Sequence, residues 1–205
     1  MENISVRYNF ELISKAFAVA AREHKNQTRK GTVFPYIIHP MDVARILFKL
    51  EANTNQICAA LLHDTIEDTT YSIKKLEEEF GDKIKDLVVF CSEEITTGKN
   101  EQNKKNWKKR KEKVINKAKL ASNEELLILF ADKLSNMRSF CKEYAIKKDQ
   151  LWEKFNGSKE DQFWFNQSLY LIFKTKFQYQ EQIIPFLNEY KEHINYLWPK
   201  LNNTN

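Results

Sequence analysis

Apolar residues recur every three or four positions along much of the chain, which is the spacing that lines one face of an α-helix. The first such pattern comprises Phe10, Ile13, Ala16, Phe17 and Ala20. It predicts a helix that ends near His24, before the polar stretch KNQTRKGT. Pro40 suits the first turn of a second helix, and a third is predicted from about Asn55 into LLHDTIED.

Helix-capping residues mark the next elements. Ser72 can cap a fourth helix that stops at Gly81, because a serine oxygen accepts from the free amides of a first turn and glycine commonly ends a helix. Apolar positions from Ile84 to Cys91 predict a fifth helix. The polar stretch 92–106 is expected to form an exposed loop, and the basic helix WKKRKEKVINKAKLA follows it.

Two capping signatures open the later helices. Ser122 and Glu125 stand before ELLILFADKLSNMRSF, and Ser158 and Asp161 stand before the aromatic stretch FWFNQSLYLIFKTKF. In each pair the serine can bond an amide of the first turn while the acidic side chain bonds back to the cap. A last helix is predicted near 181–197.

Composition favours the same fold class. The chain has 205 residues but only four glycines and four prolines, so it contains few helix breakers. Its length suits one domain, and no change of composition marks a linker. We therefore expect an all-α protein that forms a single helical bundle over residues 1–205.

The remaining sequence features limit the class of protein. The N-terminal stretch MENISVRYNF has no basic leader followed by an apolar segment, and no apolar run could span a bilayer, so we expect a cytoplasmic protein without membrane contact. Cys58, Cys91 and Cys141 form no CxxC pattern and are expected to be small core residues. His24 and His193 fit no motif and are expected to be ordinary surface or capping residues. The net charge of +5 allows a polyanionic partner without identifying one, and the oligomeric state stays open.

The stretch LLHDTIEDTT carries the first candidate chemistry. His63, Asp64, Glu67 and Asp68 follow the apolar run CAALL. If the helix continues, side chains three and four residues apart share one face. A charged end on a buried helix is costly unless hydrogen bonds or a cation compensate it, and a divalent metal would do so.

The same reasoning applies to Asp132, which follows the apolar run LLILFA, with Asn136 one turn later. His39 supplies another imidazole at the start of the second helix. Together His39, His63, Asp64 and Asp132 form a nitrogen and oxygen set suited to Mn²⁺, Fe²⁺ or Zn²⁺. The ordinary alternative is that each is a hydrogen-bonded core residue, which is the commoner role of a single buried histidine or aspartate.

Four stretches in fixed order give the chain a family resemblance: RKGTVFPYIIHP (29–40), AALLHDTIEDT (59–69), FGDKIKDLV (80–88) and ADKLSNMRS (131–139). With them the sequence resembles the HD-domain metal-dependent phosphohydrolases, and among these the hydrolase domain of the RelA/SpoT family. An HD pair alone is common by chance. HD followed by ED, with YIxHP before and ADKLxN after, is specific. The resemblance covers roughly residues 10–170 and implies a helical HD fold.

The resemblance implies an activity: hydrolysis of the 3′-pyrophosphate of the alarmone nucleotides ppGpp and pppGpp, with Mn²⁺ as the usual metal and pyrophosphate as a product. Glu67 and Asp68 match the acidic pair that activates water and assists proton transfer. The positions that match the family's metal ligands are His39, His63, Asp64 and Asp132.

Three further residues match positions that contact the nucleotide in this family. Arg29 and Lys30 lie ahead of YIxHP, where a guanidinium can stack on a purine and an ammonium can meet a phosphate. Asn136 follows Asp132 by one turn. A solvated loop is the alternative for Arg29 and Lys30. The basic run 104–119 is either a solvated helix face or a positive surface for a polyphosphate substrate.

The chain also departs from the longer enzymes of the family. It is too short to hold their synthetase and regulatory domains and so resembles the stand-alone small alarmone hydrolases. The segment after Asn136 lacks the ETxxIYAP pattern of the long enzymes, so the wall of the nucleotide site there is expected to differ. The aromatic residues of the same segment, Phe163, Trp164, Phe165 and Tyr170, are expected to form a core stripe, and the alternative is a wall on which a base stacks.

Two other functions stay open. The first is an HD-domain phosphohydrolase that acts on another nucleotide, such as a nucleoside phosphate or NADPH. The second is a non-catalytic nucleotide sensor or a basic nucleic-acid-binding helical protein. The intact HD and ED pairs favour catalysis because a sensor does not need water-activating carboxylates, and nucleic acid is disfavoured because no reader motif accompanies the charge.

Overall fold

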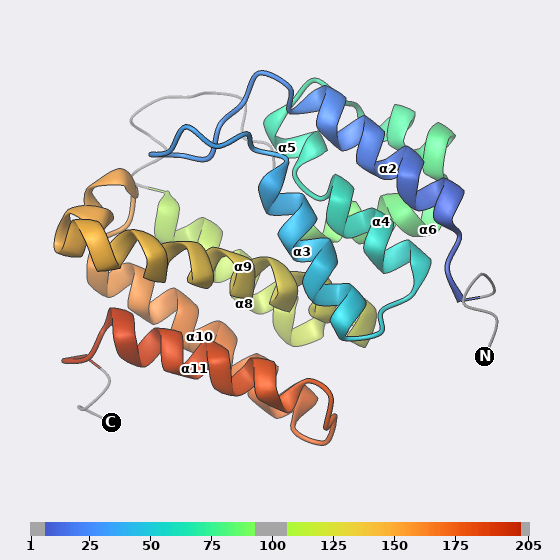
Figure 1. Cartoon of the computed structure of the whole chain (residues 1–205). Coiled ribbons are helices and arrows are strands. Elements are labelled where there is room, and N and C mark those ends of the chain that lie inside the picture. Colours follow the sequence, from blue (N-terminus) through green and yellow to red (C-terminus); the bar gives the residue numbers. More distant parts are fainter. Residues whose placement is uncertain (1–6, 93–105, 202–205) are drawn as a thin grey trace. The chain divides into compact units, whose positions relative to one another are not determined.

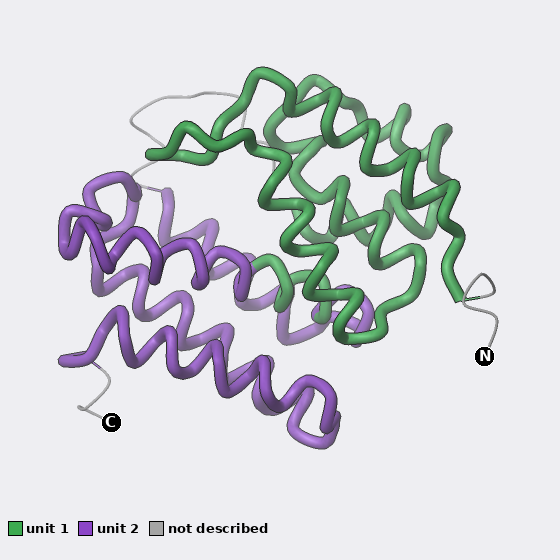
Figure 2. Tube along the Cα trace, in the orientation of Figure 1, with its two compact units in different colours: residues 1–95, 127–132 green, residues 96–126, 133–205 purple. Residues whose placement is uncertain are grey.

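The computed structural model describes residues 7–92 and 106–201, and these are predominantly helical (Figure 1). Within these ranges the only β-structure is one isolated antiparallel bridge, between Thr28 and Pro35. The all-α prediction is therefore confirmed. The chain divides into two compact units, residues 1–95 with 127–132 and residues 96–126 with 133–205 (Figure 2). The single-domain organisation stays a prediction.

The first unit contains most of the predicted motif residues. Its elements are α2 (Phe10–Glu23), α3 (Ile38–Lys49), α4 (Thr54–Leu62), α5 (Thr65–Asp68), α6 (Ile73–Cys91) and residues 127–132 of α9 (Asn123–Lys147). Helix α2 ends one residue before His24, and Pro40 lies in the first turn of α3, as the sequence predicts.

Helix α4 is the buried centre of the first unit. It packs against α2, α3 and α6, and all its residues from Gln56 to Leu62 are buried. A helix that is apolar on every side must be enclosed, which is why its neighbours surround it. Burial of one side chain such as Ile57 contributes about 1.5–3 kcal/mol. Asn53 and Gln56 close a capping box at its start, so the helix begins at a defined residue.

Helix α6 contains the break that the sequence predicts at Gly81. Ser72 caps its first turn by accepting a hydrogen bond from the amide of Lys75 at 3.2 Å. Gly81 has φ 79° and ψ 169°, so the element consists of two helical segments joined at a left-handed residue that suits glycine. Ile84 and Val88 of the second segment are buried. Most of the predicted loop 92–106 lies outside the described residues.

The second unit contains the later helices. Its elements are α8 (Trp107–Leu120), the rest of α9, the 3-10 helix η1 (Lys148–Lys154), α10 (Lys159–Phe177) and α11 (Ile184–Leu197). Both predicted capping boxes are present, at Ser122 and at Ser158. The sequence analysis did not predict η1, whose seven residues show no helical repeat long enough to recognise.

An aromatic cluster holds the second unit together. Helix α10 packs against α8 and α11. The rings of Trp152 and Trp198 stack with centroids 5.0 Å apart, and the indole nitrogen of Trp198 donates to the carbonyl of Lys159 at 3.0 Å. A Cβ atom at Gly157 would lie only 3.0 Å from the ring of Trp107, so the chain needs glycine there. Of the predicted core stripe, Phe165 is fully buried and the other three residues are half-buried.

Two smaller expectations can be compared with the structure. None of the described helices is long and apolar enough to cross a membrane. The three cysteines are free thiols. Cys58 is fully buried, as expected of a core residue, but Cys91 and Cys141 are only half-buried.

Candidate metal centre

Side chains from three separate segments of the chain meet inside the first unit: His39, the adjacent pair His63 and Asp64, and Asp132. Nε2 of His39, from α3, lies 3.1 Å from Oδ1 of Asp132, from the α9 segment, and 3.7 Å from Oδ2 of Asp64. Nε2 of His63 lies 3.0 Å from the same oxygen of Asp64 and 3.8 Å from Oδ1 of Asp132. Each imidazole Nε2 thus lies within 3.8 Å of an oxygen of Asp64 and of an oxygen of Asp132, at the place where the sequence predicts a metal. Asp132 lies at the edge of this group, outside the set of three whose ligand atoms are all close to one another.

The helix is interrupted at this place. Helix α4 stops at Leu62 and α5 begins at Thr65, so the continuous helix expected through LLHDTIED is wrong. The hydroxyl of Thr65 donates to the carbonyl of Leu62 at 2.7 Å and satisfies an acceptor at the end of α4. The break leaves His63 and Asp64 between two helices, where both side chains face His39.

A backbone hydrogen bond orients His63. Its Nδ1 lies 2.8 Å from the carbonyl oxygen of Ala60. A carbonyl can only accept, so Nδ1 carries the proton and, in the neutral ring, the lone pair of Nε2 points into the cluster. Metal-binding histidines are commonly held in this way by a partner on the other ring nitrogen.

The electrostatics of the cluster follow from two carboxylates that lie against two largely buried imidazoles. Burial alone would lower the pKa of His63, but the negative charges of Asp64 and Asp132 outweigh it and raise this pKa to about 9. Burial would likewise raise the pKa of Asp64, yet His63 holds it well below its usual range. Burial lowers the pKa of His39, against the opposing effect of Asp132. The two aspartate charges are therefore offset by positive charge at this place, which a protonated His63 or a bound cation can supply.

The donor set fits a divalent metal. The ligand atoms of His39, His63 and Asp64 all lie within 4.8 Å of one another. Nε2 of His63 is buried and makes no hydrogen bond, although it lies 3.0 Å from Asp64. Close approach without hydrogen-bond alignment is expected of two ligands that point at a common centre, and mixed nitrogen and oxygen donors suit a transition metal.

Glu67 and Asp68 lie on α5, immediately after the cluster. Both side chains are exposed to solvent. Partial desolvation and the nearby charge of Asp64 raise the pKa of Asp68. The two carboxylates are therefore accessible from solvent beside the cluster.

Tyr36 is a site residue that the sequence analysis missed. Its hydroxyl donates to Oδ2 of Asp64 at 2.6 Å. Burial and the charge of Asp64 raise the pKa of Tyr36 far above its ordinary value, so the hydroxyl stays a donor. The residue lies in the quoted YIIHP stretch, three positions before His39, and that adjacency was the available signal.

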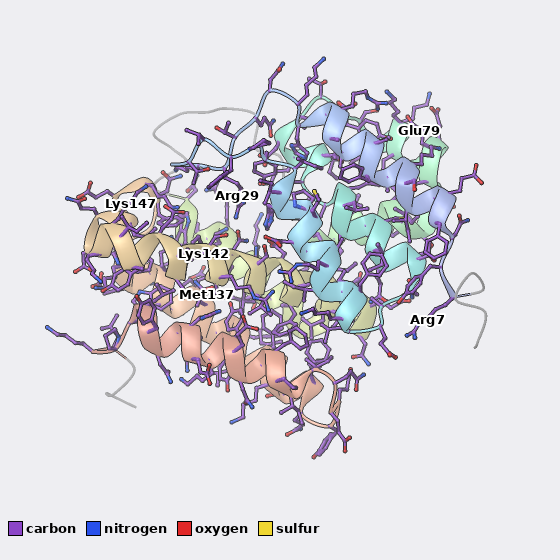
Figure 3. All side chains as sticks on the ribbon, viewed as in Figure 1. Arg7, Arg29, Glu79, Met137, Lys142 and Lys147 are labelled. Atoms are coloured by element: carbon purple, nitrogen blue, oxygen red, sulfur yellow. The ribbon has the colours of Figure 1, made fainter. Side chains whose placement is uncertain are left out.

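The three predicted substrate residues have different surroundings. Arg29 lies in the loop between α2 and α3, with its guanidinium carbon 5.6 Å from the centre of the Tyr36 ring (Figure 3). Its charge also lowers the pKa of His39. Lys30 is exposed on the same loop. Asn136 is one turn beyond Asp132 along α9 and belongs to the second unit.

The expectation that His24 is an ordinary surface or capping residue is only partly right. It follows α2 as its C-cap, but it is buried, with 2% of its surface exposed. The reason is its spacing: Ala16, Ala20 and His24 follow one another at four-residue intervals on the buried face of α2. His193 is half-buried and lies 3.3 Å from Glu189.

The described part of the basic run forms α8, and its side chains have mixed roles. Trp107, Ile115 and Ala118 are buried. Nζ of Lys108 lies 5.4 Å from the Trp164 ring, and Nζ of Lys111 lies over aromatic rings as well. Such cation–π contacts contribute about 0.5–1 kcal/mol at exposed sites, so part of this positive charge serves packing inside the second unit.

Comparison with known proteins agrees with the geometry. The HD domain family model matches residues 16–160. This chain belongs to the HD domain family. The chain is similar to a crystal structure from Listeria monocytogenes EGD-e, with a TM-score of 0.67 and 31% identity over 81% of this chain and 97% of that one.

The sequence relatives place the chain more narrowly within the HD family. It is 35% identical to the guanosine-3′,5′-bis(diphosphate) 3′-pyrophosphohydrolase MESH1 of Xenopus tropicalis, over 73% of this chain and 82% of that protein. It is 46% identical to a probable GTP pyrophosphokinase of Mycobacterium leprae (strain TN), but over only 39% of this chain and 10% of that protein. The chain thus contains an HD domain of the RelA/SpoT type, and it spans a small part of the longer relatives.

Proposed function

We propose that this chain hydrolyses the 3′-pyrophosphate of ppGpp and pppGpp, yielding GDP or GTP and pyrophosphate. The observation that carries the proposal is the meeting of His39, His63, Asp64 and Asp132, directly beside the acidic pair of α5. The similarity to MESH1 over most of both chains supports this choice of substrate. A cytoplasmic location is part of the same proposal.

The four clustered side chains would hold a divalent metal, and we propose Mn²⁺. A metal bound there supplies Lewis-acid chemistry, which offsets negative charge on a phosphate and makes water easier to deprotonate. The two histidines and two aspartates would hold it. The exposed side of Asp64, whose side chain is 18% accessible, leaves an approach for substrate.

Glu67 and Asp68 would carry the proton transfers. In the proposed reaction the oxygen of water bonds to the phosphorus attached to O3′, the bond from that phosphorus to O3′ breaks, and O3′ takes up a proton. One carboxylate orients the water and accepts its proton, and the other assists return of a proton to O3′. General acid–base catalysis of this kind contributes about 10²–10⁴-fold to a rate.

Arg29 and Lys30 would bind the nucleotide. The Arg29 guanidinium lies near the metal ligands and can meet phosphate charge or stack on a purine. Lys30 is carried on the same exposed loop and offers a second cation. Asn136 is proposed as a further nucleotide contact from its match to the family position.

A substrate panel tests the proposal. Purified protein with Mn²⁺ is incubated separately with ppGpp, pppGpp, GTP, deoxynucleoside triphosphates, NADPH and nucleoside monophosphates, and the products are separated by chromatography. The proposal expects GDP and pyrophosphate from ppGpp at a rate well above every other turnover. The same reaction with Asp64→Asn serves as the blank for contaminating hydrolases.

The other outcomes of this panel are equally informative. Cleavage of NADPH or a nucleoside phosphate with ppGpp left intact would overturn the substrate and keep the HD chemistry. Tight nucleotide binding without any turnover would point to a sensor. Affinity for DNA or RNA that falls steeply with salt would point to a nucleic-acid partner.

A further inference from the structure

The Tyr36 hydroxyl contacts the carboxylate oxygen that the two histidines share. It donates to Oδ2 of Asp64 at 2.6 Å. The same oxygen lies 3.0 Å from Nε2 of His63 and 3.7 Å from Nε2 of His39. The Tyr36 hydrogen bond therefore acts on the atom of Asp64 that faces the two histidines.

The ring of Tyr36 is itself held in place. It packs on the ring of His24, with centroids 4.7 Å apart and planes at 32°, and it meets the edge of His39 at 6.0 Å. His24 is 2% exposed, so one wall of this arrangement is rigid core. The hydroxyl cannot leave Asp64 without displacing a packed ring.

Backbone hydrogen bonds hold the loop that carries Tyr36, between α2 and α3. The amide of Tyr36 donates to the carbonyl of Gln27 at 2.9 Å, and the amide of Arg29 donates to the carbonyl of Phe34 at 2.9 Å, so the loop is a small hairpin. The Gln27 side chain donates to the carbonyl of Asp68 at 2.7 Å, and its Oε1 lies 2.8 Å from Nδ1 of His24. The hairpin is thus tied to α5 as well as to Asp64.

We propose that Tyr36 is a positioning residue, which orients Asp64 toward the bound metal and so sets the affinity of the site. The inference rests on the metal centre of the proposed function but not on the identity of the nucleotide. A carboxylate can rotate about its last side-chain bond, and a partly exposed one exchanges partners with water. A fixed donor removes this freedom before the metal arrives.

The substitution Tyr36→Phe tests this role because it removes the hydroxyl and keeps the ring that packs on His24. Loss of a hydrogen bond to a metal ligand typically lowers metal affinity about 10–100-fold. Tyr71→Phe is the matched control: Tyr71 is buried in the same unit, with its ring under Lys75. Both variants are compared with the unsubstituted chain by thermal melting without metal, which reports folding independently of the site.

The measurement is the dissociation constant for Mn²⁺, obtained by competition with a chromophoric chelator in the absence of any nucleotide. The proposal expects Tyr36→Phe to bind Mn²⁺ at least about tenfold more weakly, with Tyr71→Phe within about twofold of the unsubstituted chain. Raising Mn²⁺ to saturation should then restore most of the turnover of Tyr36→Phe. Equal Mn²⁺ affinities in all three proteins would overturn the inference.

This readout separates the two proposals. Weaker Mn²⁺ binding by Tyr36→Phe, together with intact ppGpp in the substrate panel, would support the role of Tyr36 and contradict the proposed substrate. Unchanged Mn²⁺ affinity in Tyr36→Phe, together with hydrolysis of ppGpp by the unsubstituted chain, would contradict the role of Tyr36 and support the proposed function.

Discussion

Oδ1 of Asp132 lies 3.1 Å from Nε2 of His39. This contact brings the α9 segment 127–132 to the start of α3 within the first unit, and it completes a site whose other members come from the turn after α4. The side chain of His39 is 2% exposed and that of Asp132 is 11% exposed, so the pair is largely shielded from water. The Asp132 carboxylate also approaches His63. Its loss would therefore take a negative charge away from the surroundings of both imidazole rings.

Replacing Asp132 by asparagine should therefore abolish metal binding. The amide keeps the size of the side chain but carries no charge and is a poorer metal ligand. Losing a residue that only hydrogen-bonds to a metal ligand lowers metal affinity by up to about 100-fold. Because Asp132 is proposed as a ligand itself, we expect Mn²⁺ affinity to fall by about 100-fold or more. Asp82→Asn, at a side chain of the same unit that is 78% exposed, should leave the affinity unchanged. Retained Mn²⁺ affinity in Asp132→Asn would remove this residue from the ligand set.

Glu67→Gln should separate catalysis from metal binding. Glu67 lies on α5 outside the buried cluster, so its loss should spare Mn²⁺ affinity while turnover falls by about 10²–10⁴-fold. Initial rates at saturating Mn²⁺, beside a chelator competition, measure both quantities. Glu78→Gln, with its side chain 63% exposed on α6, is the control. A Glu67→Gln protein that turns over at the normal rate would exclude the proposed role.

Acid should weaken the second unit through Glu189. Its two oxygens accept from Arg138 at 2.6 and 2.7 Å, and these hydrogen bonds hold the pKa of Glu189 below its ordinary value of 4.5. A carboxyl whose folded pKa is lowered contributes stability above its unfolded pKa, and the contribution is lost as pH falls through the folded pKa. We expect the free energy of unfolding to fall less steeply below pH 4.5 in Arg138→Met than in the unsubstituted chain.

Urea unfolding at pH 7 and at several values below pH 4.5 measures this difference. Other carboxyl groups titrate in both proteins, so the difference between the two curves reports the titration of Glu189, the partner of Arg138. Arg45→Met removes an exposed pair with Asp42 and should leave the pH dependence as it is. Parallel curves for Arg138→Met and the unsubstituted chain would show that this ion pair is not coupled to folding.

Ser122→Ala should destabilise α9 at its start. The Ser122 side chain accepts from the amide of Glu125, and the Glu125 side chain bonds back to the amide of Ser122 at 2.8 Å. Losing an N-cap costs about 0.5–2 kcal/mol. The free energy of unfolding should fall by this amount in Ser122→Ala, whereas Ser122→Asn, which keeps a capping oxygen, should stay close to the unsubstituted chain. Equal losses in both variants would argue against a capping effect.

Helices were the most predictable part of this fold because their signals are local. The four-residue spacing from Ala16 to Ala20 and the capping box at Ser122 depend only on neighbouring residues, and the structure contains both elements. The stop between α4 and α5 was missed because no glycine or proline marks it. The hydroxyl of Thr65 donates to the carbonyl of Leu62 there, but threonine makes such local bonds inside continuous helices too, so the residue gives no stop signal.

The residues proposed as metal ligands could be predicted from the sequence, but the residues that hydrogen-bond around them could not. His63 and Asp132 stand out in the sequence because apolar runs precede them. Tyr36 and Gln27 do not, since a tyrosine and a glutamine in a polar loop are ordinary residues until the hairpin brings them to Asp64 and Asp68. His24 was misjudged for the related reason that a single polar residue on an apolar helix face gives little warning of burial.

The most direct test of the central claim is the turnover of ppGpp by chelator-stripped protein as Mn²⁺ is added back. The account predicts no GDP or pyrophosphate from the stripped protein, full activity on saturation with Mn²⁺, and no activity at any Mn²⁺ concentration in Asp64→Asn. Hydrolysis of ppGpp by the stripped protein, or by Asp64→Asn at the normal rate, would contradict a metal-dependent reaction at this site.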